Sequence, residues 1–311
     1  MTHAHSHTAH HGTAHHGAGR HGAGHLSPHG SDTDVSSDTD VAPASDLQAE
    51  ILDLDAEVLA EHIASITAWL PLEEEPRHIV DLGCGTGAGT FALLARYPRA
   101  RVTAVDASAD HLRRLRARAA ELGAADRVRT VQADLDADWP DLGRPELVWA
   151  SASLHHLTDP DRTLRKVREL LAPGGLFAVV ELADFPRFLP AGAPEERPGL
   201  EDRCHAALAH HHAEHVSHRG ADWGHKLAAT GFTVEGERTI TVNIDGAHNE
   251  AVGRYALTSL QRLRASAADT LSTEDLDTLD RLLDTHSPDS ILHREDLAVR
   301  TERSVWAARP V

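Results

Sequence analysis

Apolar residues recur at helical spacing between Asp46 and Leu70, directly after a long polar beginning of the chain. The segment reads DLQAEILDLDAEVLAEHIASITAWL, and its apolar positions follow one another at steps of three and four. Ser45 and Asp46 can cap its start, and Pro71 directly follows its end. The pattern predicts an amphipathic helix that opens the folded part of the chain.

From residue 78 onward, apolar runs alternate with amphipathic stretches. Strands are expected at 78–83, 101–107, 127–134, 146–154 and 176–183, with helices between them at about 88–96, 108–122 and 159–172. Near-continuous apolar strands separated by helices indicate a parallel sheet that is covered on both faces and joined by right-handed crossovers. The predicted fold class is therefore α/β, with a doubly wound sheet.

After Ala183 the alternation stops at a proline-rich loop, DFPRFLPAGAPEERPG. The pattern then predicts helices near 200–217, 221–230, 247–264 and 273–285, and two strands at 232–244 and 296–308. Two late strands joined by a long excursion suggest a hairpin-like pair at one sheet edge. We expect the inserted segments 184–230 and 245–295 to form a cap over a ligand site.

The first 45 residues do not have the composition of a folded segment. They contain ten of the chain's 25 histidines among Gly, Ala, Ser and Thr, followed by the repetitive SDTDVSSDTD. Such a segment cannot bury enough apolar surface to offset the entropy of ordering its backbone. We expect 1–45 to be a disordered tail and 46–311 to be one domain with a core at 46–183. The tail is either a solvated linker or a binder of divalent metal.

Composition narrows the class of partner. Acidic residues outnumber Lys and Arg by 48 to 30, which gives a formal net charge of −18 and argues against nucleic acid as a partner. The two cysteines, Cys84 and Cys204, do not support a disulfide framework and fit a reducing cytoplasm. No apolar run approaches the ~20 residues of a membrane span. A cytoplasmic protein with a small-molecule substrate and no membrane partner is expected, and its oligomeric state stays open.

The stretch IVDLGCGTGAGT at 79–90 places glycines at the end of the first strand. Ligands of such sheets lie beyond the carboxyl ends of the strands, and Gly83, Gly85 and Gly87 allow the backbone to turn sharply and approach a ligand. With Ala88, this turn also satisfies the G-x-G-x-x-A fingerprint of dinucleotide-binding proteins. The glycines alone therefore leave the ligand class open.

Three acidic residues at strand ends favour a cationic nucleoside over NAD. Asp81 precedes the glycines, where its charge would repel a pyrophosphate and attract a cation. Asp106 ends the second strand and is placed to accept hydrogen bonds from ribose hydroxyls, while Asp134 ends the third and can accept one from an adenine amine. Each acid could instead be only a capping or turn residue.

The motifs VDLGCGTG, AVDAS, QADL, LHHLTDP and LLAPGGLFAVVE occur in an order and at spacings that resemble class I S-adenosylmethionine-dependent methyltransferases. The resemblance covers about 46–183 and implies a Rossmann-like seven-stranded sheet with an antiparallel last strand. It implies S-adenosyl-L-methionine as cofactor. The implied contacts are Asp81 to the methionine amino group, Gly83, Gly85 and Gly87 along the cofactor, Asp106 to the ribose, Asp134 and Leu135 to the adenine, and Cys84 and Ala107 beside them. The sequence departs from many relatives at Asp136, Asp138 and Trp139.

Methyl transfer from a sulfonium is an in-line displacement, so alignment of the reactants is the main task of the protein. His155 and His156 follow the fourth strand and are candidate general bases for an acceptor that loses a proton. The other interpretation is that one ring caps the next helix and the other packs against the cofactor.

Substrate-contacting residues are expected in the inserted segments, and we assign Phe185, His211, Trp223 and Tyr255 to this set. His211 and His215 share a helix face at metal-ligand spacing, near Glu214 and Cys204, but no metal is assigned to the site. The expected acceptor atom is oxygen first, nitrogen second and carbon third. The alternatives are a non-catalytic S-adenosylmethionine-binding protein with a metal-binding tail and, less favoured, a nicotinamide dehydrogenase.

Overall fold

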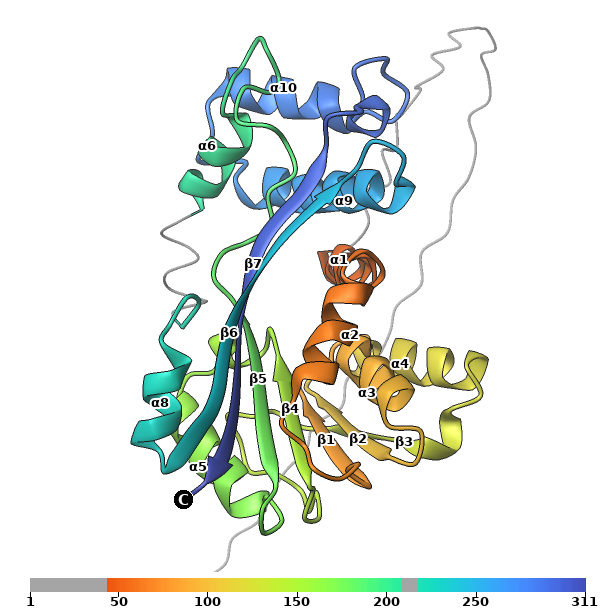
Figure 1. Ribbon diagram of the computed structural model, residues 1–311. Coiled ribbons are helices and arrows are strands. Elements are labelled where there is room, and N and C mark those ends of the chain that lie inside the picture. Colours follow the sequence, from red (N-terminus) through yellow and green to blue (C-terminus); the bar gives the residue numbers. More distant parts are fainter. Residues whose placement is uncertain (1–43, 209–217) are drawn as a thin grey trace, which may run out of the picture. The chain divides into compact units, whose positions relative to one another are not determined.

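A computed structural model of the chain describes residues 44–208 and 218–311. Within these residues seven strands form one sheet in the order β3-β2-β1-β4-β5-β7-β6 (Figure 1). The strands are β1 His78–Leu82, β2 Arg101–Asp106, β3 Val128–Gln132, β4 Leu147–Ser151, β5 Leu176–Leu182, β6 Phe232–Asp245 and β7 Ala298–Pro310. The first five strands pair in parallel, and β7 pairs antiparallel with both β5 and β6. The predicted α/β fold with an antiparallel last strand is confirmed.

Helices cover both faces of the sheet, as the apolar strands predict (Figure 1). One face carries α2 Ala60–Trp69, α3 Ala88–Arg96 and α4 Ala109–Glu121, and the other carries α5 Pro160–Leu170 and α8 Trp223–Ala229. Along β1, Ile79 packs in one hydrophobic cluster with Leu93 of α3, whereas Val80 packs in the other with Leu164 of α5. Alternate side chains of one strand therefore bind the two helical layers.

The predicted first helix is two helices in the structure. α1 Ala44–Val58 and α2 meet at Leu59, whose backbone (φ −95°, ψ 12°) leaves the helical conformation. Hydrogen bonds from Leu59 N to Asp55 O and from Ile63 N to Leu59 O continue the ladder on both sides. Leu59 is buried in the core, so the change of direction occurs at a packed position.

β6 and β7 extend beyond the other strands. β5 pairs with β7 only as far as Leu182, which lies opposite Arg303, while β6 and β7 remain paired up to Asp245 and Ala298. Residues 241–245 and 298–302 therefore form a two-stranded ribbon that projects past the carboxyl end of β5. The helices attached to this part of the chain are α6 Leu200–Ala207, α9 Glu250–Ser266 and α10 Thr273–Leu283, with a short 3-10 helix, η3 Ile291–His293 (Figure 1).

One predicted element ends earlier than the pattern indicates, and another is described only in part. β4 stops at Ser151 because Ala152 has φ +50°, a left-handed conformation that ends an extended strand, and a 3-10 helix, η2 Leu154–His156, follows. Of the helix predicted at 200–217, α6 accounts for Leu200–Ala207. Residues 209–217 and the predicted tail up to residue 43 lie outside the described residues.

Replacement of Gly83 by Ala tests how tightly the turn after β1 is packed. A Cβ at Gly83 would lie 2.4 Å from Ser153 Cβ at φ +69°, whereas Gly123 has φ +64° and nothing within 4 Å of that position. We expect Gly123→Ala to lose about 1 kcal/mol of unfolding free energy from the left-handed backbone alone. Gly83→Ala should lose roughly 1–3 kcal/mol more because the packed neighbour must move. Urea denaturation measures both, and equal losses would contradict the packing.

Candidate functional site

The glycine turn is fastened to the strands on both sides of β1. The N–H groups of Gly83 and Cys84 donate to Val105 O of β2 at 2.8 and 2.9 Å. On the β4 side, Ser153 Oγ donates to Leu82 O at 2.9 Å. Gly83, Gly85 and Gly87 all have positive φ, at 69°, 53° and 105°. The turn is therefore held in a conformation that other residues adopt with difficulty, at the carboxyl edge of the sheet.

Asp106 connects this turn to the end of β2. Its Oδ2 accepts from Gly85 N at 2.9 Å, and its Oδ1 accepts from Ser108 N at 2.8 Å and lies 3.2 Å from Nδ1 of His111. Burial alone would raise the pKa of Asp106, but the hydrogen bonds from His111, Ser108 and Gly85 lower it below its usual value. A charged carboxylate therefore stands where the sequence places the ribose.

His111 is a site residue that the sequence analysis missed. It lies in the first turn of α4, where the cap Ser108 accepts its backbone N–H. A histidine five residues after a strand-end aspartate, in the first turn of a helix, is the signal that was available. Its ring adds a donor beside Asp106.

Asp81 lies inside the turn and beneath α3. Its side chain is buried, and its Oδ2 accepts from Thr90 Oγ1 at 2.6 Å. Burial raises its pKa to about 7, the hydrogen bonds from Thr90 oppose the shift, and the charge of Asp106 adds to it. In this arrangement Asp81 stabilises the first turn of α3, which is the alternative role that the sequence left open. Its contact with an ammonium group stays a prediction.

The segment after β3 is held against the start of α5. Asp134 is exposed, and its Oδ1 accepts from Asp136 N at 2.9 Å. The Asp136 carboxylate accepts from the backbone N–H groups of Thr158 and Asp159, and Trp139 Nε1 donates to Leu135 O at 3.0 Å. Asp136 and Trp139 fix the shape of the loop that carries Asp134 and Leu135.

The remaining predicted contact residues lie at the same edge. Cys84 is buried, and burial raises the pKa of its thiol well above the usual value. Ala107 is exposed, and its carbonyl accepts from Gln132 Nε2 at 3.0 Å. The structure therefore brings together the glycine turn and the strand-end acids, while leaving their ligand contacts as predictions.

His155 and His156 differ in their surroundings. Nδ1 of His155 lies 2.5 Å from Glu181 Oε2, and both side chains are buried. The other carboxylate oxygen of Glu181 accepts from the backbone N–H groups of Ser153 and Leu154 at 3.2 and 2.8 Å. Glu181 is the second residue that sequence analysis missed, because a glutamate inside an apolar strand gives no sign of its partner.

His156 is exposed to solvent, and its ring centroid lies 4.2 Å from that of His155. Its pKa is lowered to about 4, first because the ring is partly desolvated and then because of the charges of His155 and Arg262. The charge of Glu181 acts in the opposite direction. At neutral pH its imidazole is therefore uncharged and is a weaker base than an ordinary histidine.

The predicted substrate residues are not gathered in one place. Tyr255 is buried, and its hydroxyl donates to Asp55 Oδ1 of α1 at 2.7 Å. Phe185 is half-buried beneath the Arg219 guanidinium, which lies 4.1 Å from the ring centroid. Trp223 is fully buried with Leu227 in the cluster under α8, so the structure places its indole in the core and not in a roof. His211 lies outside the described residues.

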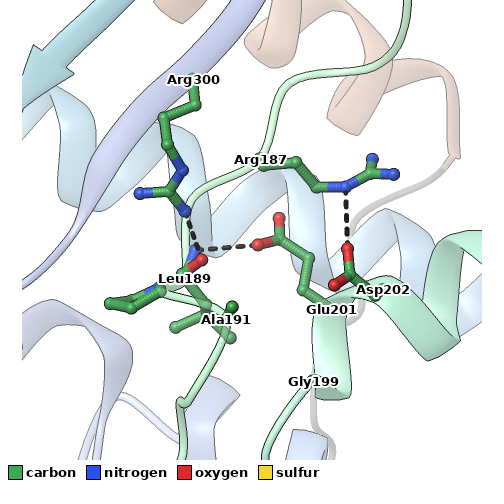
Figure 2. Close-up of a pocket in the computed structure, with 8 residues that line it drawn as sticks. Arg187, Leu189, Ala191, Gly199, Glu201, Asp202 and Arg300 are labelled. Carbon is green, nitrogen blue, oxygen red and sulfur yellow. Dashed lines mark hydrogen bonds and ion pairs between the residues drawn. The ribbon is translucent and has the colours of Figure 1, made fainter.

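A small cavity of about 130 Å³ lies between α6, the segment after β5, and β7, and Figure 2 shows its lining. Glu201 is buried there and accepts from Phe188 N and Leu189 N at 2.9 and 2.8 Å, while burial raises its pKa to about 7. Arg187 contacts Asp202 at 3.4 Å, and Arg300 donates to Leu189 O (Figure 2). These bonds fasten the cap to the ribbon, which is a structural role.

α1 packs against the glycine turn. A Cβ on Gly85 would lie 3.2 Å from Leu52 Cδ1 of α1, and Arg114 of α4 bonds Asp46 at 3.3 Å. A groove of about 650 Å³ between α1 and α4 reaches Thr86 of the turn. The first helix therefore covers the glycine turn, and a ligand seated on that turn would contact α1.

Residues 44–208 and 218–311 contain no group of three or more His, Cys, Asp or Glu side chains arranged to hold a metal ion. The predicted pair His211 and His215, with Glu214, lies outside that part of the chain, and Cys204 is buried with its pKa raised to about 12. No described helix is long and apolar enough to cross a membrane.

Known proteins resemble this chain in the part that carries the glycine turn. Residues 80–177 match a family model described as a methyltransferase domain. A trans-aconitate 2-methyltransferase of Acidovorax sp. strain JS42 is 40% identical over 104 residues, or 33% of this chain and 38% of that protein. A protein of the same name from Methylobacterium radiotolerans is 40% identical over 116 residues, or 37% of this chain and 42% of that protein. The chain thus aligns with about two-fifths of these relatives.

A crystal structure from Bacillus halodurans C-125, described as that of a methyltransferase, has a TM-score of 0.51 and 18% sequence identity. It covers 81% of this chain and 100% of that one. At this identity the similarity supports the fold alone.

The pH dependence of ligand affinity distinguishes the two roles of Asp81. If its carboxylate receives an ammonium group, binding requires the ionised form, so affinity for S-adenosylhomocysteine should rise as pH increases from 6 towards the pKa of about 7. We expect a change approaching tenfold per pH unit below that pKa, measured by calorimetry. Asp81→Asn keeps an acceptor for Thr90 and should remove this dependence, while the ligand's own titration remains. The same pH profile in both proteins would show that Asp81 only stabilises α3.

Proposed function

We propose that this chain transfers the methyl group of S-adenosyl-L-methionine to a small-molecule acceptor, because residues 80–177 match a methyltransferase domain. Oxygen is the first choice of acceptor atom, nitrogen the second and carbon the third. The observation that carries the proposal is the set of strand-end carboxylates around the glycine turn, next to the histidine pair that follows β4.

The residues present fit a cationic nucleoside. Asp106 is ionised at the end of β2, Asp134 is exposed beyond β3, and Asp81 lies below the turn. The turn donates two of its N–H groups to Val105 O and a third to Asp106, so these three are not directed at a phosphate. A pyrophosphate here would meet negative charge, whereas a sulfonium and an ammonium group are attracted.

By this proposal Asp106 holds the ribose, Asp134 and Leu135 the adenine, and Asp81 the methionine amino group. Gly83, Gly85, Gly87, Cys84 and Ala107 line the same surface. The bound cofactor supplies an activated methyl group that needs no further activation by the protein. The protein aligns the acceptor with that methyl group, which can contribute ~7–11 kcal/mol, and excludes water.

The histidine pair supplies a proton acceptor at the required edge. Glu181 Oε2 holds Nδ1 of His155, so Nε2 is the ring nitrogen that this proposal assigns to the proton acceptor. His156 is uncharged at neutral pH and reaches solvent. Ser153 hydrogen-bonds the carbonyl of Leu82, the residue before Gly83. Because Ser153 is also two residues before His155, the same short segment holds both the proposed base and the cofactor surface.

Product formation tests the proposal directly. The protein is incubated with S-adenosylmethionine and a panel of organic acids, phenols and amines, and mass spectrometry follows S-adenosylhomocysteine and methylated product. At least one acceptor should give both products in equal amounts. Binding of S-adenosylmethionine without turnover across the panel would instead favour a non-catalytic cofactor-binding protein.

Substitution of the histidines and of Glu181 tests the proton acceptor. We expect a ~10²–10⁴-fold fall in kcat for at least one of His155→Ala and His156→Ala, with cofactor affinity retained. If His155 acts, Glu181→Gln should lower kcat as well, and the double variant should lose little more than His155→Ala, because Glu181 works through that ring. His286→Ala, at an exposed position in another part of the chain, is the control. Unchanged turnover in both single histidine variants would remove this role.

A further inference from the structure

Arg303 of β7 keeps a buried hydrogen-bond donor that has no partner. Its side chain is 9% exposed, and its Nη2 donates to Asp55 Oδ1 of α1 at 2.9 Å. Its Nη1 is buried as well and makes no hydrogen bond within the part of the chain that the structure describes. A guanidinium cannot lose its charge, so an unpartnered donor on a buried guanidinium is costly and requires an explanation.

Arg303 stands apart from the other described side chains that have such an atom. Arg219 is the other arginine among them, but its side chain is 19% exposed and its guanidinium lies over the ring of Phe185. Three others are neutral indole rings in the core, those of Trp149, Trp223 and Trp306. In Arg303 a permanent charge is more than nine-tenths buried and still has a free donor, which points to a ligand.

The register of β7 places Arg303 at the carboxyl edge of the sheet. Its Cα pairs with that of Leu182, the last residue of β5. The preceding residue of β5 is Glu181, which holds His155 on the other face of the strand. Arg303 itself shares a face of β7 with Val305, which packs in the cluster under α3. The guanidinium therefore lies where β5 ends, on the face of the sheet that α1 approaches.

α1 connects this guanidinium with the glycine turn. Leu52 contacts the turn, since a Cβ on Gly85 would lie 3.2 Å from its Cδ1. Asp55 follows three residues later, so the two side chains share one face of α1, with about 5–6 Å between their Cβ atoms. Arg303 is thus bonded to α1 about one turn from the residue that covers the proposed cofactor surface. The side chain of Asp55 is 26% exposed, so solvent reaches this ion pair.

We propose that Nη1 of Arg303 donates to a carboxylate oxygen of the methyl acceptor, which then lies beyond the end of β5 and beside α1. Asp55 fixes one edge of the guanidinium and leaves the other for the ligand, and a charged donor in a poorly solvated place favours an anionic acceptor atom. The ligand class is that of small carboxylic acids. This inference rests on the proposed methyltransferase function. The methionine carboxylate of the cofactor is a second source of the same chemistry.

The test measures binding of acids and of their esters to the full-length protein saturated with S-adenosylhomocysteine. Calorimetry compares succinate, fumarate and benzoate with their methyl esters on the wild type and on Arg303→Gln. We expect at least one acid to bind more tightly than its ester, and Arg303→Gln to weaken that acid by about ten- to a hundredfold while leaving the ester unchanged. Arg254→Gln, which removes the ion pair between α9 and Glu57 of α1, is the matched control and should keep the preference of the wild type.

Asp55→Asn separates ligand binding from a structural role of the ion pair. It keeps the guanidinium and an acceptor for Tyr255 but removes a negative charge, so the acid should bind about three- to tenfold more tightly. A structural role predicts instead that Asp55→Asn and Arg303→Gln change acid and ester binding alike. If Arg303→Gln does not fold, Asp55→Asn decides alone, and unchanged or weaker binding of the acid contradicts the inference.

A second pair of ligands separates the acceptor from the cofactor. Methylthioadenosine lacks the amino-acid part of S-adenosylhomocysteine, so weaker binding of only the latter to Arg303→Gln, with acid binding unchanged, would assign the guanidinium to the cofactor and overturn the inference. A wild type that binds no acid better than its ester overturns it too, as does an equal loss of the preference in Arg254→Gln. Failure of the wild type to bind S-adenosylhomocysteine would instead contradict the proposed function on which the inference rests.

Discussion

The close packing of Gly83 against Ser153 is the contact on which the candidate site depends. The space between the turn after β1 and the segment after β4 leaves no room for a Cβ, since one would approach Ser153 within 2.4 Å. Ser153 hydrogen-bonds the last residue of β1, and its own backbone N–H is held by Glu181 of β5. Three neighbouring strands are thus joined at their carboxyl ends, and Glu181 extends the connection to His155.

This connection explains why the backbone at Ala152 is held in a left-handed conformation. A positive φ at a non-glycine residue is unfavourable and persists where surrounding bonds over-determine it. Ala152 N donates to Val180 O at 2.8 Å, and the next two N–H groups donate to Glu181. The strained residue turns the chain out of β4, so that the histidine pair follows at once.

The second organising feature is the projecting β6–β7 ribbon, which joins the helices beyond the edge to the sheet.

The sequence predicted the order and type of the strands because parallel strands buried on both faces leave long apolar runs. It also located the glycine turn and the acids, since these follow strands directly. It missed the break at Leu59, where the apolar spacing continues without interruption. It also placed Trp223 over the site, although an aromatic residue in an inserted segment can equally belong to the core, as this one does.

Contacts between distant residues were out of reach for a different reason. Glu181 and His155 are 26 positions apart, and Arg303 and Asp55 are 248 apart. Neither pair leaves a local pattern, so only the three-dimensional arrangement brings them together. The same holds for Asp136, whose acceptance of two backbone N–H groups at the start of α5 gives an otherwise unexplained acid a structural role.

The proposed function requires that the edge of this sheet binds a sulfonium nucleoside and rejects a nucleotide with a pyrophosphate. Titration calorimetry of the purified protein with S-adenosylmethionine, and separately with NAD, measures this most directly. We predict saturable one-to-one binding of S-adenosylmethionine and no detectable heat from NAD under the same conditions. Binding of NAD without binding of S-adenosylmethionine would show that this edge is a dinucleotide site and that the chain is not an S-adenosylmethionine-dependent enzyme.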